Sequence, residues 1–325
     1  MDKKILILKN DRVGDFFHSL RNIQLIREFY SNHKIEIYLS KINIRFSSVF
    51  NSKKLIIQEV NYNLSTVEKL KLFYKLMRND YEYVFILSPK NFYFYLPLIF
   101  RKIKFLALCV DGVKRKRPTT FLRKYLFKFI VNDRSKNIKK LPIYEMEKKL
   151  LENVMPITKS KKRNDFIKYD PKGKRLNALF HYKSEIFGNI NDNKDQFNNF
   201  FSQLVRKFNI YIKISTDIEL NSSSNELVDT FKNNHNIKFL GPVDAESLMK
   251  EIGDSDLIIS PHGAISCIAG YYNKNIIDIF DRTITRNAFS EFKPYTNGYY
   301  QFIFKSLDLN KTFLKIMYKI NNLFY

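Results

Sequence analysis

Short apolar segments alternate with helical patterns along this chain, in two series separated by a polar stretch. In the first series, apolar runs typical of strands lie at 4–8, 35–39, 55–60 and 83–87, with helical periodicity at 67–77 and 145–154. In the second, strand-like runs at 176–181, 210–215, 237–240, 257–259 and 276–280 alternate with helical patterns at 194–208, 226–233, 244–252 and 264–272. Strands that alternate with helices in this way predict parallel sheets covered by helices. Each series therefore predicts one Rossmann-like lobe.

The polar, lysine-rich stretch between the two series contains Pro171 and Gly173 and is typical of a linker. It divides the 325 residues into an N-terminal lobe at 1–157, a linker at 158–174 and a C-terminal lobe at 175–325. Both lobes have an ordinary length for an α/β domain. The sequence thus predicts two Rossmann-like lobes that face a central cleft.

Composition excludes several classes of protein. A hydrophobic content of 45% excludes a disordered chain. The two cysteines, Cys109 and Cys267, lie far apart and match no metal spacing, which predicts a reducing cytoplasm and no disulfide framework. Neither series carries a G-x-G-x-x-G or G-x-x-x-x-G-K-[ST] loop, so the dinucleotide and P-loop motifs are excluded. We expect no metal site, because no cluster of Asp, His or Cys has metal-ligand spacing.

A formal net charge of +24 predicts an anionic partner. The excess is concentrated between Lys114 and Lys140, where eleven basic residues face a single acid, Asp133, and alternate with aromatic and aliphatic side chains. The apolar run just before it is interrupted by Pro97 and by basic residues, which leaves it too short to cross a bilayer. A basic amphipathic surface on anionic lipid fits this pattern. An ordinary solvated face over core helices is the alternative.

The first candidate site lies where the strand at 4–8 runs through a polar turn into a helix that opens at Gly14-Asp15. A strand that leads directly into a helix start forms a ligand-binding corner in α/β folds. A carboxylate there would repel phosphate, so Asp15 suits a group that takes a proton or holds a sugar hydroxyl. The alternative is that Asp15 only complements the helix dipole.

The second candidate site lies in LIISPHGAISCIAGYY, residues 257–272. A strand ends at Ser260, and Pro261-His262-Gly263 turn the chain into a helix lined with small residues. Backbone N–H groups from Gly263 to Ile265, with Ala264 between them, could hold a diphosphate, and Ser266 could donate to the same phosphates. The alternative is a tight turn followed by a helix packed closely on its sheet, with His262 an ordinary turn residue.

Together the two corners resemble glycosyltransferase family 9, typified by the bacterial ADP-heptose:lipopolysaccharide heptosyltransferases, which have the GT-B fold. LILKNDRVGDFFHSL is similar to the family's N-terminal signature, including Arg12 and the Gly14-Asp15 pair. SPHGAISCIAGYYNKNIIDIF follows the layout of its C-terminal signature, with Gly263 in register. The resemblance covers nearly the whole chain in order, although each motif is short.

The chain departs from the family pattern in the second lobe. Pro261-His262 stand where the family has Asp-Thr, and Ser266 stands where it has a histidine. The Lys-x-Trp-Pro element is absent, so Lys183, with Ser184 beside it, or Lys194 would supply the cation that faces the phosphates. These changes leave the identity of the nucleotide sugar open. They are also compatible with a chain that has lost the transferase activity.

The resemblance implies an inverting, metal-independent transfer of a heptose or similar sugar. Asp15 would take the proton of the acceptor hydroxyl. The nucleoside diphosphate would lie near Arg12, Gly14, His262 and Gly263. No cofactor is implied, since the nucleotide sugar is a substrate.

The expected partners are a nucleotide-sugar donor, an anionic surface-glycan or glycolipid acceptor and an anionic membrane surface, with no nucleic acid. We accordingly expect a cytoplasmic protein, peripheral at the inner face of the bacterial inner membrane. Two alternatives remain. One is an inactive glycosyltransferase-like binding protein, and the other is a basic nucleic-acid-binding protein, although the sequence contains no helix-turn-helix, finger or single-strand-binding motif.

Overall fold

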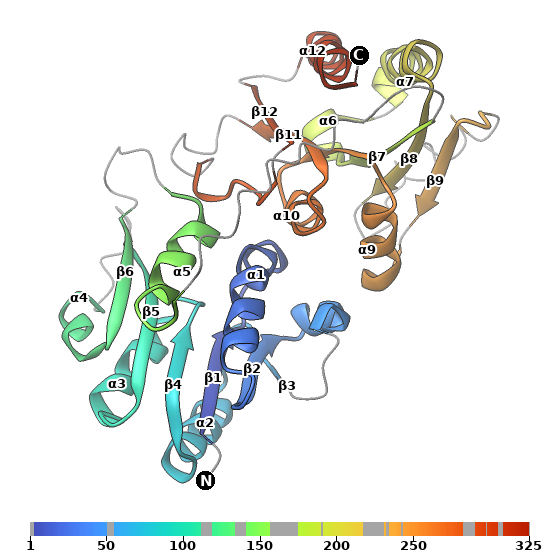
Figure 1. Ribbon diagram of the computed structural model, residues 1–325. Helices are drawn as coiled ribbons and strands as arrows, with labels where there is room; N and C mark the ends of the chain where they lie inside the picture. The colour runs from blue at the N-terminus through green and yellow to red at the C-terminus, as the bar shows by residue number, and fades with distance from the viewer. Residues whose placement is uncertain are drawn as a thin grey trace. The chain divides into compact units, whose positions relative to one another are not determined.

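A computed structural model divides the chain into two compact units, and each is an α/β structure built on one six-stranded parallel sheet (Figure 1). It describes residues 3–50, 55–111, 119–133, 141–156, 175–189, 191–216, 231, 234–241, 243–281, 290–296, 298–304 and 308–324. Unit 1 comprises Met1–Ser160 and Asn287–Lys293, and unit 2 comprises Lys161–Arg286 and Pro294–Tyr325. The expected linker at 158–174 and most of the expected helix at 226–233 lie outside the described residues.

The sheet of unit 1 has the strand order β3-β2-β1-β4-β5-β6, and every described pairing in it is parallel. Its strands are β1 (Lys4–Lys9), β2 (Lys34–Ser40), β3 (Leu55–Val60), β4 (Tyr81–Ile86), β5 (Lys104–Asp111) and β6 (Lys128–Asp133). Its helices are α1 (Val13–Phe29), α2 (Thr66–Arg78), α3 (Leu96–Ile99), α4 (Thr119–Leu122) and α5 (Ile143–Leu151), with short 3₁₀ helices η1 (Asn43–Phe50), η2 (Asn91–Tyr95) and η3 (Arg123–Tyr125). This is the strand order of the Rossmann fold.

The sheet of unit 2 has the order β12-β11-β10-β7-β8-β9, which is the same Rossmann order when the strands are counted from β7. Its strands are β7 (Leu176–Tyr182), β8 (Ile210–Thr216), β9 (Ile237–Gly241), β10 (Leu257–Pro261), β11 (Asn275–Asp281) and β12 (Tyr299–Phe304). Its helices are α6 (Ser184–Phe187), α7 (Lys194–Phe208), α9 (Ala245–Gly253), α10 (Ala264–Tyr271) and α12 (Leu309–Phe324), with the 3₁₀ helix η4 (Asn191–Asn193). The expected fold class of two Rossmann-like lobes is confirmed.

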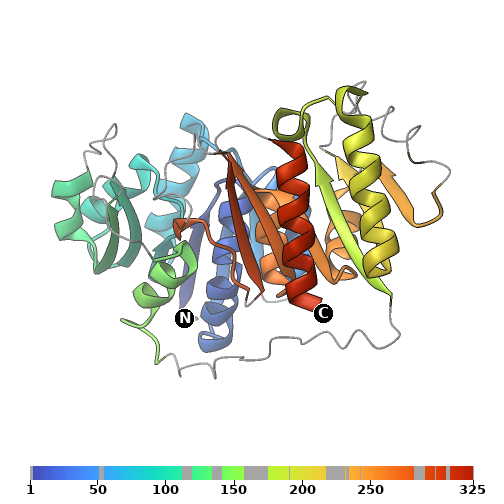
Figure 2. The ribbon, with the colours of Figure 1, turned by 90° about the horizontal axis from the view of Figure 1, so that it is seen from above.

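Helices cover both faces of the sheet in unit 1. Helices α1 and α5 contact each other and lie on the same side of the sheet in Figure 2, whereas α2 lies on the other side. One apolar core joins that second face to α2 through Leu72, to η2 through Phe94 and to α4 through Leu122. Because both faces are covered, the central strand β1 is buried from Ile5 to Lys9 and reads as a nearly continuous apolar run.

Local signals in the sequence explain several helix boundaries. Ser65 and Glu68 form a reciprocal capping box at the start of α2, and Asp244 accepts a hydrogen bond from the backbone of Ser247 at the start of α9. Asn209 ends α7 in the left-handed conformation, with φ of 48°. In unit 2, Phe200 of α7 stacks on Phe313 of α12 at 4.1 Å, which places these two helices together on the sheet (Figure 2).

Strands β5, β6 and β12 and helix α12 were not among the predicted elements. Strand β6 lies inside the segment that the charge pattern presented as a basic amphipathic surface. It is an edge strand with Lys128 and Phe129 exposed, so its sequence lacks the buried apolar run that marks a central strand.

Candidate functional site

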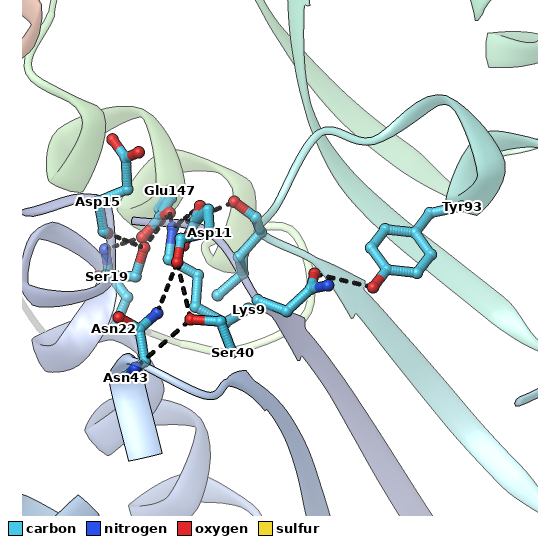
Figure 3. Close-up of polar contacts among 11 residues, drawn as sticks. Lys9, Asp11, Asp15, Ser19, Asn22, Ser40, Asn43, Tyr93 and Glu147 are labelled. Atoms are coloured by element: carbon cyan, nitrogen blue, oxygen red, sulfur yellow. Dashed lines mark hydrogen bonds and ion pairs between the residues drawn. The ribbon is translucent and has the colours of Figure 1, made fainter. Parts of the chain in front are cut away.

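The carboxyl end of β1 forms the first candidate site, at the point in unit 1 where the strand order reverses between β1 and β4. Lys9 ends the strand, Arg12 occupies the N-cap position of α1, and Asp15 lies in the first turn of that helix. Gly14 and Asp15 are half-buried, whereas Arg12 is exposed. Figure 3 shows the carboxylate of Asp15 pointing away from the buried polar groups beneath it. This is the place where open α/β sheets bind ligands.

The turn between β1 and α1 is held by hydrogen bonds from three other parts of unit 1. The carbonyl of Asp11 accepts from Ser40 Oγ at 3.0 Å and from Asn43 Nδ2 at 2.9 Å (Figure 3). Asn10 donates to the carbonyl of Asn61 at 2.9 Å and accepts from the Tyr93 hydroxyl at 2.8 Å. These contacts come from the loops that follow β2, β3 and β4. They fix the backbone from which Asp15 projects.

A buried ionic cluster lies directly beneath this turn. Lys9 Nζ is 2.9 Å from Asp11 Oδ2 and 3.8 Å from Glu147 Oε1, and Lys9 and Glu147 are both almost completely buried. Burial favours the neutral amine, but the attraction of Asp11, Glu147 and Asp15 outweighs it and raises the pKa of Lys9. Burial also raises the pKa of Glu147, against the opposing effect of Lys9. A fixed positive charge therefore stands under the first turn of α1.

Glu147 also ties α5 to α1. Ser19 Oγ donates to its Oε1, and Asn22 Nδ2 donates to its Oε2 at 3.1 Å and to the carbonyl of Tyr144 at 2.9 Å (Figure 3). Ser19 and Asn22 both lie on α1, one and two turns after Asp15. The helix that carries Asp15 is thereby held against a second helix by buried polar contacts as well as by apolar packing.

Sequence reasoning missed both Lys9 and Glu147. The available signal was an unbroken run of buried-strand residues that ends in a lysine, and an acid on the face of 143–151 that also carries Ile143 and Met146. Each is a charged residue at a position where the pattern predicts burial, and buried charges in proteins are paired.

Lys90 is a second cation at the same edge of the sheet, on the loop that follows β4. Its ammonium lies 3.7 Å from the centre of the Tyr62 ring and has no hydrogen-bond acceptor within the described residues. Burial lowers the pKa of Lys90 to about 8, against an opposing effect of Asp11. Tyr62 follows β3, so the loops after β3 and β4 both contribute to this edge.

The second candidate site lies at the carboxyl end of β10, next to the point where the strand order of unit 2 reverses. His262 Nδ1 lies 2.6 Å from Asp278 Oδ2, and its ring stacks on Phe280 with centroids 4.2 Å apart. Asp278 is completely buried in β11 and also accepts from Ser266 Oγ at 2.7 Å and from the Tyr299 hydroxyl at 2.8 Å. Burial, and next the neighbouring Asp278, raise the pKa of Tyr299, so its neutral hydroxyl is the donor.

Gly263 precedes the first helical residue, Ala264, and leaves the approach to the start of α10 open. A Cβ atom at Gly263 would meet nothing closer than the carbonyl oxygen of Pro261, at 3.9 Å. The φ of Gly263 is 170°, which is extended backbone that other residues also adopt. Neither packing nor backbone conformation within the described residues therefore requires a glycine here, and its effect is to keep the start of α10 open.

Ser266 occupies a different place from the one expected. The sequence suggested that its hydroxyl would reach a bound phosphate, but the side chain is completely buried and donates to Asp278. Ser266 lies about one helical turn after Gly263, on the side of α10 that faces the sheet, where β11 carries Asp278. Asp278 was missed by sequence reasoning, although an acid in the middle of the apolar strand NIIDIFD was a visible signal.

The expected cations of unit 2 lie on the segments that follow β7. Strands β7 and β10 pair Phe180 with Ile259, so Lys183 and His262 each lie three residues beyond paired positions, at the same edge of the sheet. Lys183 occupies the N-cap position of α6, followed by Ser184, and both are half-buried. Lys194 begins α7 and is exposed. Their roles in binding stay predictions.

Three further features bear on the earlier expectations. The described helices include none that is both long enough and apolar enough to cross a bilayer. Of the basic segment at 114–140, the structure describes residues 119–133, and the cluster Lys114–Arg117 lies outside that part. Cys109 and Cys267 are both buried.

Comparison with solved structures identifies the fold. The chain is similar to the E. coli heptosyltransferase WaaC with ADP-2-deoxy-2-fluoro heptose, with a TM-score of 0.64 and 13% identity over 98% of this chain and 99% of that one. E. coli ADP-heptose lps heptosyltransferase II has a TM-score of 0.64 and 12% identity, over 99% and 98% of the two chains. A glycosyl transferase family 9 protein from Veillonella parvula has a TM-score of 0.63 and 10% identity, over 99% and 90%.

The sequence matches no protein-family model and no curated protein. A UDP-GlcNAc 2-epimerase from Methanocaldococcus jannaschii also has a similar fold, with a TM-score of 0.53, 13% identity, and coverage of 97% of this chain and 92% of that one. At identities this low, structural similarity shows the fold alone. The predicted likeness to heptosyltransferases is confirmed for the fold. Because one fold hosts different reactions, the site has to carry the argument for function.

Proposed function

We propose that this protein is an inverting glycosyltransferase that moves a heptose or similar sugar from a nucleoside diphosphate to a hydroxyl of an anionic surface glycan or glycolipid. The observation that carries the proposal is Asp15: a half-buried carboxylate in the first turn of α1, on a turn anchored by three loops and a buried ionic cluster. A likeness in fold to WaaC, which was solved with ADP and with an ADP-heptose analogue, supports the choice of donor class.

In the proposed reaction, Asp15 acts as the general base. The acceptor oxygen attacks the anomeric carbon and loses its proton to the carboxylate of Asp15, while the bond from that carbon to the diphosphate oxygen breaks and its electrons leave with the diphosphate. A carboxylate is a weak base, but proton transfer late in an oxocarbenium-like transition state needs only modest basicity. The anchored turn keeps the base in one position, which preserves the alignment that this transfer requires.

The leaving diphosphate gains negative charge and needs stabilisation from donors that are already in place. We assign this role to the backbone N–H groups at Gly263 and Ala264, to His262, and to Lys183 or Lys194, without a metal ion. Asp278 accepts from Nδ1 of His262 and so fixes the orientation of the imidazole. A protonated imidazole held in this way can donate from its other nitrogen to a phosphate oxygen.

The direct test is turnover by an Asp15→Asn variant. We expect transfer to fall by roughly two orders of magnitude or more, with donor binding retained, because the amide cannot take the proton. A matched control is Glu246→Gln, which removes an exposed acid from the first turn of α9 and so changes a helix-dipole contact without touching the site. Turnover in Asp15→Asn equal to that of Glu246→Gln would contradict the assignment.

The departures from the family pattern at Pro261-His262 and Ser266 support one alternative, an inactive glycosyltransferase-like protein that only binds its ligand. The same assay distinguishes the two. An enzyme releases nucleoside diphosphate from a sugar donor in an Asp15-dependent way, whereas a binding protein gains thermal stability from the nucleotide sugar and releases nothing.

The proposed enzyme works at the inner face of the bacterial membrane, where such acceptors are made.

A further inference from the structure

Helix α2 carries an exposed apolar stripe that the sequence reading did not single out. Val67, Leu70, Tyr74 and Met77 recur at intervals of three and four residues and are 60%, 64%, 48% and 61% exposed. Residues at this spacing share one face of a helix. The opposite face of α2 buries Leu72 and Leu76 in the core of unit 1, so packing against the sheet is already satisfied without the stripe.

The apolar surface continues over the neighbouring elements of the same layer. Phe73 of α2 contacts Phe100, just after α3, with ring centroids 4.9 Å apart. Elements η2, α3 and α4 cover the same face of the sheet as α2, because their buried residues share one core with it. Together with the start of β6 they expose five more large apolar side chains: Tyr95, Ile99, Phe121, Phe127 and Phe129. We call the outer surface of α2, η2, α3, α4 and the start of β6 the α2–α4 face.

Basic residues are interleaved with these apolar side chains. The segments 66–78, 91–104 and 119–128 contain ten lysines and arginines and one acid, Glu68, which is engaged in the capping box of α2. Two of the ten, Lys75 and Arg123, are paired with Glu36 and Asp111, which leaves eight cations. The cations lie beside the rings: Arg78 Cζ is 4.2 Å from the Tyr74 centroid, and Lys124 Nζ is 5.4 Å from that of Phe121. The α2–α4 face is therefore apolar and positively charged at the same time.

We propose that the α2–α4 face lies on an anionic lipid bilayer. Its apolar side chains would enter the boundary between headgroups and acyl chains, while its lysines and arginines contact the lipid phosphates. The charge of the face selects this partner, since an anionic surface complements the eight cations that are not paired with Glu36 or Asp111. A second copy of the same face would place like charges opposite each other. Nucleic acid would contact the cations through its phosphates but would leave exposed aliphatic residues such as Val67, Leu70 and Met77 unburied. The proposal is independent of the sugar transfer proposed above.

The experiment is flotation of the full chain with vesicles of phosphatidylcholine and phosphatidylglycerol, against vesicles of phosphatidylcholine alone. We expect binding only to the anionic vesicles, weakening as salt is raised, because surface charges are screened. A charge variant combines Lys71→Gln, Lys102→Gln and Lys124→Gln, all exposed on the α2–α4 face. Its partition should fall on the order of a hundredfold, since each basic side chain near anionic lipid contributes about fivefold.

The matched charge control combines Lys207→Gln, Lys238→Gln and Lys250→Gln, which remove the same charge from exposed positions of unit 2. It should bind nearly as well as the natural chain.

A second pair of variants tests the apolar contribution. Leu70→Ser with Met77→Ser removes two side chains that are 64% and 61% exposed, and the control, Leu314→Ser with Tyr318→Ser, removes two on α12 that are 61% and 70% exposed. Surface changes of this kind leave folding nearly unaffected. The α2 variant should lose roughly tenfold in partition while its control loses little.

Three results would overturn the proposal. One is equal binding of either test variant and its control. Another is self-association of the natural chain that the Leu70→Ser and Met77→Ser changes abolish, which would make the face a dimer interface. The third is that the natural chain does not bind anionic vesicles but binds RNA in a salt-sensitive way, and that the charge variant loses this RNA binding.

Discussion

Replacing Lys9 by methionine should destabilise unit 1 strongly, and more so near pH 8 than near pH 5. Methionine has a similar length, so the change removes the charge while largely filling the space. Asp11 and Glu147 would lose their shared cation, and Glu147, which is completely buried, would retain only its hydrogen bonds from Ser19 and Asn22.

The geometry sets the size of the effect. With an effective dielectric constant of about 20, charges at the observed 2.9 Å and 3.8 Å attract Lys9 to Asp11 and to Glu147 by about 6 and about 4 kcal/mol. Desolvation of the three groups offsets much of this attraction. Removing one partner of a buried pair leaves an uncompensated charge and typically costs about 3–5 kcal/mol, which is the loss in unfolding free energy that we expect.

The pH dependence follows from the direction of the pKa shifts. The pKa of Lys9 is raised on folding, so its contribution is fully present below the ordinary pKa of lysine and is lost as the pH rises through the folded value. The pKa of Glu147 is also raised, so ionising it disfavours the folded state as the pH rises above the ordinary range of a carboxyl group. Without Lys9 this penalty grows. The variant should therefore recover part of its lost stability near pH 5 relative to pH 8.

Urea unfolding of four proteins measures this: the natural chain, Lys9→Met, Glu147→Gln and the double variant. Because the two side chains interact, the double variant should be more stable than the sum of the single losses predicts. Additive losses, or a loss in Lys9→Met below about 1 kcal/mol with no pH dependence, would refute the reasoning that the cluster is a paired ionic unit.

Two further predictions concern unit 2. Gly263→Val should fold normally, because its Cβ points into open space and the backbone is extended, but it should weaken nucleotide binding by calorimetry because the side chain fills the approach to α10; equal affinity would move the diphosphate elsewhere. Asp278→Asn should raise the KM for the donor more than Tyr299→Phe does, because the neutral amide no longer balances the charge of a protonated His262 that donates to phosphate, whereas Tyr299 donates to the carboxylate of Asp278. Long-range ¹⁵N spectra of the imidazole report its protonation, and an unchanged protonation in Asp278→Asn would contradict the role of Asp278.

The sequence by itself determined the fold class and the two corners of the candidate site. Alternating strands and helices predict parallel sheets, and parallel strands place their carboxyl ends on one edge. Asp15 and His262 each follow a strand within a few residues, so their positions at such an edge are local consequences of chain order. The strand order could not be read in this way, because it depends on which strands pair across long stretches of chain.

Only the tertiary structure decided which groups act together. Lys9 meets Glu147 across 138 residues of chain, and Ser266 turns away from the expected phosphate site because Asp278 of β11 lies beneath it. Strand β6 and the stripe on α2 were likewise invisible in the pattern, since a sequence shows that a side chain is apolar but not whether another element covers it. Pairing and burial are properties of contacts between distant segments, and these exist only once the chain has folded.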